Sequence, residues 1–136
     1  MSYLLDTNIC IAVLNGRPSH TRLRLQDAVA QGHAIVISTL VLHELYYGAA
    51  KSSRPAETLA AIDSMIVEPY QILKYSAHAA LEAAKIRANL ERKGTPIGWY
   101  DVLIAGQAMA EGFKVATANT REFARVPALE IEDWTE

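Results

Sequence analysis

Three acidic residues occupy positions in this sequence where carboxylates could act together. Asp6 directly follows the apolar stretch 3–5, Glu44 lies within the apolar stretch 40–46, and Asp101 stands near the start of a further apolar stretch. Taken one at a time, each acid could simply cap a helix, favour a helix dipole or face water. Brought together, three carboxylates repel one another, and proteins resolve such a cluster by sharing protons or by binding a hard divalent cation. The pattern therefore indicates a candidate metal site.

The other polar residues near these acids favour a particular kind of cation. Thr7, Asn8 and Asn119 add oxygen ligands, and an all-oxygen set suits Mg²⁺ or Mn²⁺, whereas zinc prefers histidine or cysteine. The histidines show no metal-ligand spacing, so we assign them to packing or to the surface: His20, His33, His43 and His78. The single cysteine, Cys10, has no basic neighbour in the sequence, and we expect a small core residue rather than a nucleophile.

Short apolar runs alternate with longer helical patterns, and these elements must position the acids. The apolar runs, most of them after glycine or proline, predict strands at 3–5, 34–38, 70–73, 113–117 and 129–132. Strand–helix–strand alternation in a chain of this size is typical of an α/β fold with a parallel sheet and helices on both faces. Functional groups of such sheets gather at the carboxyl ends of the strands. Asp6, at the end of the first predicted strand, stands at such a position.

Apolar residues at spacings of three and four predict two amphipathic helices, over 56–66 and 76–92. Ser76 is the expected N-cap of the second helix, and Gly94 follows its end. The predicted apolar faces are Leu59, Ile62 and Ile66 in the first helix and Ala77, Leu81, Ala84 and Ala88 in the second.

Each acid also stands beside or within a predicted helix. Thr7 and Asn8 begin a helical pattern that continues through Ile9 and Val13. A helix capped by Ser38 or Thr39 carries Glu44 and ends near Gly48, and a helix that contains Asp101 begins near Trp99 and ends at Gly112.

Composition limits the class of protein. The chain has 136 residues, of which 51% are apolar and 21% charged, and we expect a single globular domain over 1–136. One cysteine suits a reducing cytoplasm, and neither a membrane span nor a signal peptide is predicted. The formal charge of −2 counts against a simple electrostatic nucleic-acid binder. It is compatible with a nuclease, because acidic metal ligands lower the net charge.

Four stretches, YLLDTNICI, ISTLVLHELYYGAAKS, RKGTPIGWYDVLIAGQAMAEG and TANTREFARVPALEIEDW, occur in this order and together cover nearly the whole chain. They resemble the PIN-domain family, and within it the enteric-type VapC toxins of bacterial VapBC toxin–antitoxin pairs. The resemblance implies a three-layer α/β/α fold with a central parallel sheet of about five strands. It also implies a Mg²⁺-dependent endoribonuclease, with Mn²⁺ as a substitute.

The resemblance also implies roles for particular residues. The active-site acids are Asp6, Glu44 and Asp101, and the cation is held by Asp6 and Asp101. Asn119 stands at the fourth motif position, where the wider family often has aspartate, with Glu122 as a supplementary acid. Thr7, Asn8 and Asn119 are expected to support the carboxylates.

The implied substrate is initiator tRNA, cut by water in the anticodon stem-loop to leave 5′-phosphate and 3′-hydroxyl ends, which inhibits translation. Arg121 is the preferred contact to the RNA backbone, and Trp99 and Tyr100 are candidates for stacking on an unpaired base. Further candidates for phosphate contact are Arg17, Arg22, Arg24, Lys51, Arg54 and Arg125.

The expected partners are a VapB-type antitoxin, whose C-terminal tail occupies a groove of the toxin, and a second copy of the chain, so that the full assembly is larger than a dimer. Tyr46, Tyr47 and the helix at 56–66 are candidate contact surfaces.

Two other classes of protein remain open at this point. An aspartyl-phosphate phosphatase or receiver domain also has an aspartate after its first strand. The Asp-x-Asp pattern of one such family is absent, however, because the sequence reads Asp6-Thr7-Asn8, and no lysine follows the strand at 113–117 before Arg121. A non-catalytic interaction protein with this fold is the second alternative, and the intact set of three acids argues against it.

Overall fold

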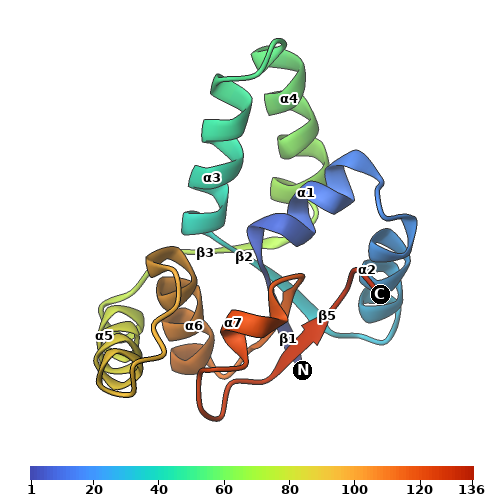
Figure 1. Cartoon of the computed structure of the whole chain (residues 1–136). Coiled ribbons are helices and arrows are strands. Elements are labelled where there is room, and N and C mark those ends of the chain that lie inside the picture. Colours follow the sequence, from blue (N-terminus) through green and yellow to red (C-terminus); the bar gives the residue numbers. More distant parts are fainter.

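Five strands form one parallel sheet at the centre of the molecule (Figure 1), in a computed structural model that describes all of residues 1–136. The strands are β1 Ser2–Leu5, β2 Ala34–Ser38, β3 Gln71–Leu73, β4 Lys114–Thr117 and β5 Ile131–Asp133. Their order is β3-β2-β1-β4-β5, and every neighbouring pair is parallel. The predicted sheet is confirmed, and each strand lies within two residues of its predicted range.

Helices cover both faces of the sheet, as predicted (Figure 1). They are α1 Thr7–Asn15, α2 Ser19–Ala30, α3 Thr39–Ala50, α4 Pro55–Ile62 with a following π-helical turn Asp63–Val67, α5 Ala77–Arg92, α6 Trp99–Glu111 and α7 Thr120–Phe123. From β1 the chain adds β2 and β3 on one side, and it then crosses back to add β4 and β5 on the other side of β1. Because crossovers between parallel strands are right-handed, this change of side puts α1 to α4 on one face of the sheet and α5 to α7 on the other. The α3–α4 hairpin projects beyond the sheet. Neither α2 nor α7 was predicted from the sequence.

The buried side of α5 differs from the predicted side. Ala77, Leu81, Ala84 and Ala88, the predicted apolar face, are all exposed. Ala79, Ala83 and Leu90 are buried instead. The reason is the close approach of α6, where a Cβ added to Gly106 would lie only 2.5 Å from the Cβ of Ala83. The small side chains of Gly106 and Ala83 allow the two helices to come so near.

The helix predicted over 56–66 is correct in position but differs in detail. The α-helix ends at Ile62, and a π-helical turn continues to Val67. Ile62 and Ile66 are buried as predicted, whereas Leu59 is 39% exposed. Leu59 lies in the part of the α3–α4 hairpin that extends past the sheet, where no layer is available to cover it. In the same hairpin, α3 runs past Gly48 and ends at Ala50.

A single cluster of 26 buried apolar residues forms the core, and the three residues before Asp6 belong to it. Cys10 is fully buried in this cluster, and burial raises the pKa of its thiol well above its usual value. Both observations agree with the predicted core role and leave the thiol without access to a substrate.

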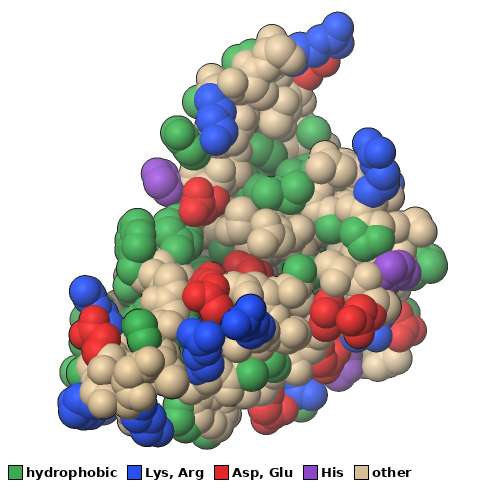
Figure 2. All heavy atoms as spheres, in the orientation of Figure 1, with side chains coloured by type: hydrophobic (Ala, Val, Ile, Leu, Met, Phe, Trp, Pro, Cys, Tyr) green, Lys and Arg blue, Asp and Glu red, His purple; other side chains and the backbone are tan.

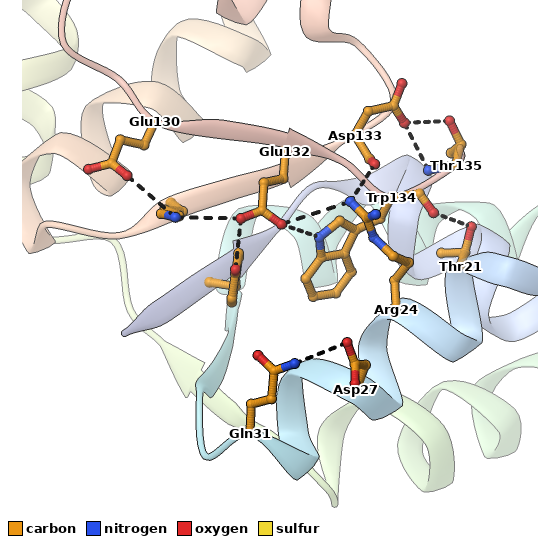
Figure 3. Close-up of polar contacts among 11 residues, drawn as sticks. Thr21, Arg24, Asp27, Gln31, Glu130, Glu132, Asp133, Trp134 and Thr135 are labelled. Carbon is orange, nitrogen blue, oxygen red and sulfur yellow. Dashed lines mark hydrogen bonds and ion pairs between the residues drawn. The ribbon is translucent and has the colours of Figure 1, made fainter.

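Polar contacts around Glu132 link β5, the C-terminal strand, to the rest of the molecule (Figure 3). Glu132 accepts hydrogen bonds from the hydroxyl of Tyr3 at 2.8 Å and from the indole of Trp134 at 3.2 Å, and it pairs with Lys114 at 3.5 Å. The carbonyl of Trp134, whose side chain is buried, accepts a hydrogen bond from Thr21 of α2 at 2.8 Å. These contacts hold β5 at the edge of the sheet.

No helix of the chain combines the length and the hydropathy needed to cross a bilayer.

Candidate active site

Asp6 ends β1 and begins α1. Its backbone N–H donates to the carbonyl of Ala116 in β4 at 2.9 Å, which extends the sheet. Its Oδ1 accepts a hydrogen bond from the N–H of Thr7 at 2.8 Å, and its Oδ2 accepts one from the hydroxyl of Thr117 at 2.9 Å. Only 6% of Asp6 is exposed. Burial and the charge of Glu44 raise the pKa of Asp6, although the two hydrogen bonds act in the opposite direction.

A second acidic group forms where the start of α6 meets the end of β4. The side-chain amide of Asn119 donates to Asp101 at 2.9 Å and to Glu122 at 2.6 Å. Burial, a hydrogen bond shared with Glu122 and the charges of Asp6 and Glu122 raise the pKa of Asp101 to about 7. Hydrogen bonds from Asn119 and from the N–H of Gly98, at 3.0 Å, lower the pKa of Glu122. Of these two carboxyl groups, Asp101 is therefore the one that takes up a proton first.

Glu44 reaches the same region from α3. Ser38, the last residue of β2, caps this helix by accepting a hydrogen bond from the N–H of Leu40 at 3.0 Å, so the predicted cap is confirmed. Tyr100 joins α6 to the first turn of α3, because its hydroxyl donates to the carbonyl of Leu40 at 2.5 Å. The pKa of Tyr100 is raised by burial and by the charge of Glu44. The carboxylate of Glu44 is thus close enough to act electrostatically on both Tyr100 and Asp6.

These groups surround one cavity of about 440 Å³, which we call the acidic cavity. Its lining residues are Asp6, Thr7, Asn8, Ile11, Glu44, Tyr47, Gly48, Lys51, Tyr100, Asp101 and Asn119. Figure 2 shows acidic side chains near the middle of this face, below the α3–α4 hairpin, with basic side chains beside them. The three predicted acids therefore come from β1, α3 and α6 to one hollow at the carboxyl ends of the strands.

The oxygen atoms of the lining suit a hard divalent cation, although the acids are not close enough together to coordinate one as they stand. Carboxylate, amide and hydroxyl oxygens line the acidic cavity, and no His or Cys does. Burial and the charges of neighbouring carboxylates raise the pKa values of Asp6 and Asp101, and no ion pair of the chain includes either residue. No three Asp, Glu, His or Cys side chains lie close enough together to be a ready-made metal site. The residues present fit Mg²⁺ or Mn²⁺ in their donor atoms, and their spacing must tighten to hold it.

Each of the four histidines contacts a different protein group, and no two of them share a partner. His20 bonds to the carbonyl of Thr135, His33 packs edge-on against Tyr3, His43 lies 3.3 Å from the hydroxyl of Tyr100, and His78 pairs with Glu82. The four histidines are spread over the molecule, in packing or surface positions.

The predicted RNA contacts lie at different places relative to the acidic cavity. Tyr100 lines it, whereas Trp99 is 67% exposed and lines smaller hollows against α5. The two rings meet edge-on, with their centroids 5.1 Å apart. Arg121 is exposed and is not among the lining residues. Its contact with RNA stays a prediction.

Sequence reasoning missed Thr117, and it named Lys51 as a phosphate contact and Tyr47 as a contact surface without predicting that both line the acidic cavity. Thr117 holds Asp6, and its only signal in the sequence is a hydroxyl at the last position of a strand. Tyr47 in α3 and Lys51, the C-cap of α3, lie three and seven residues beyond Glu44, a spacing that puts all three on one side of the helix. That spacing was visible in the sequence, but nothing there indicated that this face lines the acidic cavity.

The fold and the site together define a class, an α/β/α domain with an all-oxygen acidic centre at the carboxyl ends of a parallel sheet. The family model described as PIN domain matches residues 3–129. Among curated proteins, the chain is 42% identical to the tRNA(fMet)-specific endonuclease VapC of Salmonella typhimurium and 37% identical to ribonuclease VapC2 of Rickettsia felis, with 98% of each chain covered in both cases. The chain belongs to the PIN-domain family, and its relatives there are VapC proteins.

Solved structures agree. The VapBC2 complex of Rickettsia felis bound to a promoter DNA fragment contains a chain that superposes with a TM-score of 0.89 at 36% identity, covering 97% of this chain and 98% of the other. DNA-bound VapBC from Salmonella typhimurium gives a TM-score of 0.89 at 42% identity, with 98% of both chains covered. The resemblance noted in the sequence is confirmed.

Proposed function

We propose that this chain is the toxin of a VapBC toxin–antitoxin pair and acts as a Mg²⁺-dependent endoribonuclease. The observation that carries the proposal is the convergence of Asp6, Glu44 and Asp101 on one cavity whose lining suits a hard cation. Relatives named ribonuclease or endonuclease VapC match the chain over nearly its full length. Neither an aspartyl-phosphate enzyme nor a non-catalytic interaction protein is favoured by these relatives.

In this proposal Asp6 and Asp101 hold the cation, and Glu44 completes the acidic set. When bound, a divalent cation neutralises phosphate charge and makes water a better nucleophile. The chain's own residues prepare the acids for this. Thr117 and the N–H of Thr7 fix the direction of the Asp6 carboxylate. Such supporting hydrogen bonds commonly change metal affinity by about 10- to 100-fold.

Asn119 orients the second acid, Asp101, and ties it to Glu122 through one amide group. An amide cannot replace a carboxylate as a charged ligand, so three acids rather than four face the cation. Tyr100, joined to Leu40 by its hydroxyl, keeps the start of α6 against α3 and thereby sets the width of the acidic cavity. Asn8 and Thr7 line the same wall and complete the set of oxygen donors.

The proposed substrate is initiator tRNA, cut in the anticodon stem-loop to leave 5′-phosphate and 3′-hydroxyl ends. This is supported by the relative from Salmonella typhimurium, which is named for tRNA(fMet) and shares 42% identity with this chain. Loss of initiator tRNA would stop translation, and the proposed place of action is the cytoplasm, where that substrate is found.

The proposed partner is a VapB-type antitoxin, and the proposed assembly also contains two copies of the chain. A groove of about 500 Å³ runs between α1 and the α3–α4 hairpin, with apolar residues such as Leu14, Leu45 and Ile62 in its walls (Figure 2). Ile11, Glu44 and Gly48 line both this groove and the acidic cavity. A peptide in the groove would therefore reach the acids. Homodimerisation through the exposed Tyr46 and Tyr47 or through α4 stays a prediction.

The test compares isosteric variants of the acids. Asp6→Asn and Asp101→Asn remove one charge each, and Asp63→Asn, at an exposed position in the π-helical turn, is the matched control. Purified proteins are incubated with initiator tRNA and with an elongator tRNA, with Mg²⁺ or with chelator, and the RNA ends are sequenced. Calorimetric titration with Mn²⁺ measures metal binding independently of cleavage.

We expect cleavage and Mn²⁺ binding to be lost in Asp6→Asn and in Asp101→Asn and retained in Asp63→Asn. Wild-type cleavage by Asp6→Asn, or cleavage that persists in chelator, would show that the acidic cavity is not a metal-dependent nuclease site. Equal cleavage of both tRNAs would remove the assignment of the substrate and leave the nuclease activity in place.

A further inference from the structure

The acidic cavity contains a single cationic side chain, Lys51. It lines the cavity together with three carboxylates. Its ammonium group does not neutralise them, because none of the ion pairs of the chain includes Lys51. Instead, Nζ lies 4.5 Å from the centroid of the Tyr47 ring, within the range of a cation–π contact. The charge is therefore held in place and remains available to an anion that enters the cavity.

The position of Lys51 at the C-terminal end of α3 separates this charge from the acids. Glu44, Tyr47, Gly48 and Lys51 follow one another at spacings that share a helix face. Seven residues of helix correspond to about 10 Å. This rise separates the backbone positions of Glu44 and Lys51, and we therefore expect an anion at Lys51 to be a different phosphate from the one at the acids.

Tyr47 offers a surface of another kind. Its side chain is 56% exposed although it lies at the wall of the cavity. The ammonium of Lys51 lies over one face of this ring, and the other face is suited to stacking on an unpaired base, because every base presents a flat face. An ammonium group and an aromatic ring side by side therefore match the two parts of one nucleotide, its phosphate and its base.

Gly48 leaves the helix surface between these groups bare. A Cβ added there would meet no atom within 4 Å. A chain passing from the acids toward Lys51 thus meets no side chain at this point of α3.

We propose that Tyr47 and Lys51 form a nucleotide-binding subsite of the acidic cavity, which holds the phosphate and base of an RNA nucleotide next to the one that is cleaved. This inference rests on the proposed ribonuclease function and assigns residues that the acids and their supports do not include. The subsite supplies the affinity for a polyanion that a ring of carboxylates by itself cannot supply.

The test measures how cleavage depends on salt. Each phosphate contact with a single strand adds about 0.7 to the slope of log affinity against log salt. We expect Lys51→Ala to raise KM about tenfold with kcat nearly unchanged, and to lower the slope of log kcat/KM by about 0.7. Lys51→Arg should restore both, because it keeps the charge. Lys85→Ala, which removes an exposed cation from α5, is the matched control.

The aromatic half of the subsite is tested with Tyr47→Phe, which keeps the ring, and Tyr47→Ala, which removes it. We expect wild-type KM for Tyr47→Phe and about a tenfold increase for Tyr47→Ala, with the salt slope unchanged. Thermal melts establish that each variant is folded, and the conservative variants decide the outcome if an alanine variant is not.

A binding experiment separates failure of this inference from failure of the proposed function. Fluorescence anisotropy is measured with a labelled single-stranded RNA of the anticodon-loop sequence, on Asp6→Asn with and without Lys51→Ala. Cleavage by Asp6→Asn would contradict the proposed function itself. If Asp6→Asn is inactive and Lys51→Ala leaves RNA affinity unchanged, the subsite alone is wrong, and the pair merely stabilises α3. Weaker antitoxin binding with unchanged RNA binding would also overturn it, in favour of a protein-binding surface.

Discussion

Replacing Thr117 by valine removes the one hydroxyl that links Asp6 to the segment carrying Asn119. This hydroxyl donates to Oδ2 of Asp6 at 2.9 Å and accepts a hydrogen bond from the N–H of Asn119 at 2.8 Å. Valine keeps the shape of the fully buried side chain, so packing is retained while both hydrogen bonds are lost. The substitution therefore isolates the role of the hydroxyl.

The expected cost follows from the kind of bond removed. A hydrogen bond to a charged group contributes about 1.5–3 kcal/mol, and the orphaned N–H of Asn119 adds to the loss, so we expect about 2–3 kcal/mol of destabilisation. In a chain of this size that corresponds to a fall in Tm of roughly 10 °C. Because the hydroxyl also orients the Asp6 carboxylate, Mn²⁺ affinity should fall by about 10- to 100-fold.

Thr21→Val is the matched control. Thr21 is equally buried, and its hydroxyl donates one hydrogen bond, at 2.8 Å, to the carbonyl of Trp134. This contact involves none of the residues that line the acidic cavity. We expect about 1 kcal/mol of destabilisation there and no change in metal binding. Urea unfolding and calorimetric titration with Mn²⁺ measure the two quantities. If Thr117→Val changed Mn²⁺ affinity no more than Thr21→Val, the reasoning that Thr117 orients a metal ligand would be refuted.

Two further predictions concern stability. Gly106→Ala should destabilise the protein by about 1–3 kcal/mol, because its Cβ would lie 2.5 Å from that of Ala83, whereas Gly48→Ala, with nothing within 4 Å, should stabilise α3 by up to about 1 kcal/mol in urea unfolding. Burial raises the pKa of Glu132, but hydrogen bonds such as that from Tyr3 outweigh it, so the folded pKa lies below the unfolded value of about 4.3. The carboxylate therefore stabilises the fold above that pH and loses this effect as pH falls through the folded pKa. The Tm difference between wild type and Glu132→Gln should be present at about pH 7 and shrink below about pH 4, and a constant difference would contradict this.

Strands were predictable because a buried strand leaves a short continuous apolar run in the sequence. Central strands of a parallel sheet are covered on both faces and appear as continuous apolar runs, as at 34–38. Helices were less predictable where two faces are equally apolar. In α5 alanines recur on several sides, so periodicity cannot choose among them, and the choice is made by Gly106 on another helix. The mostly polar α2 buries only Thr21, Leu25 and Ala28, which is too weak a pattern to predict a helix.

The acids of the site were predictable for a topological reason. Asp6 follows a strand, Asp101 lies at the start of a helix and Glu44 lies in the second turn of a helix that follows a strand directly. In a parallel sheet such positions meet at one edge. The contributions of Thr117 and Lys51 depend instead on distances between elements. The sequence carries no local sign that a threonine at the end of β4 reaches Asp6, or that the far half of α3 lines the same cavity.

The pairing of Asp6 with Thr117, 111 positions later in the chain, also dictates when the site can exist. A ribosome that synthesises this protein releases Asp6 first, whereas the hydroxyl that holds Asp6 and the amide that holds Asp101 emerge near the end. Incomplete products that stop before β4 carry the acids without the arrangement. A chain whose proposed target is tRNA therefore cannot damage the translation machinery until its own synthesis is almost complete.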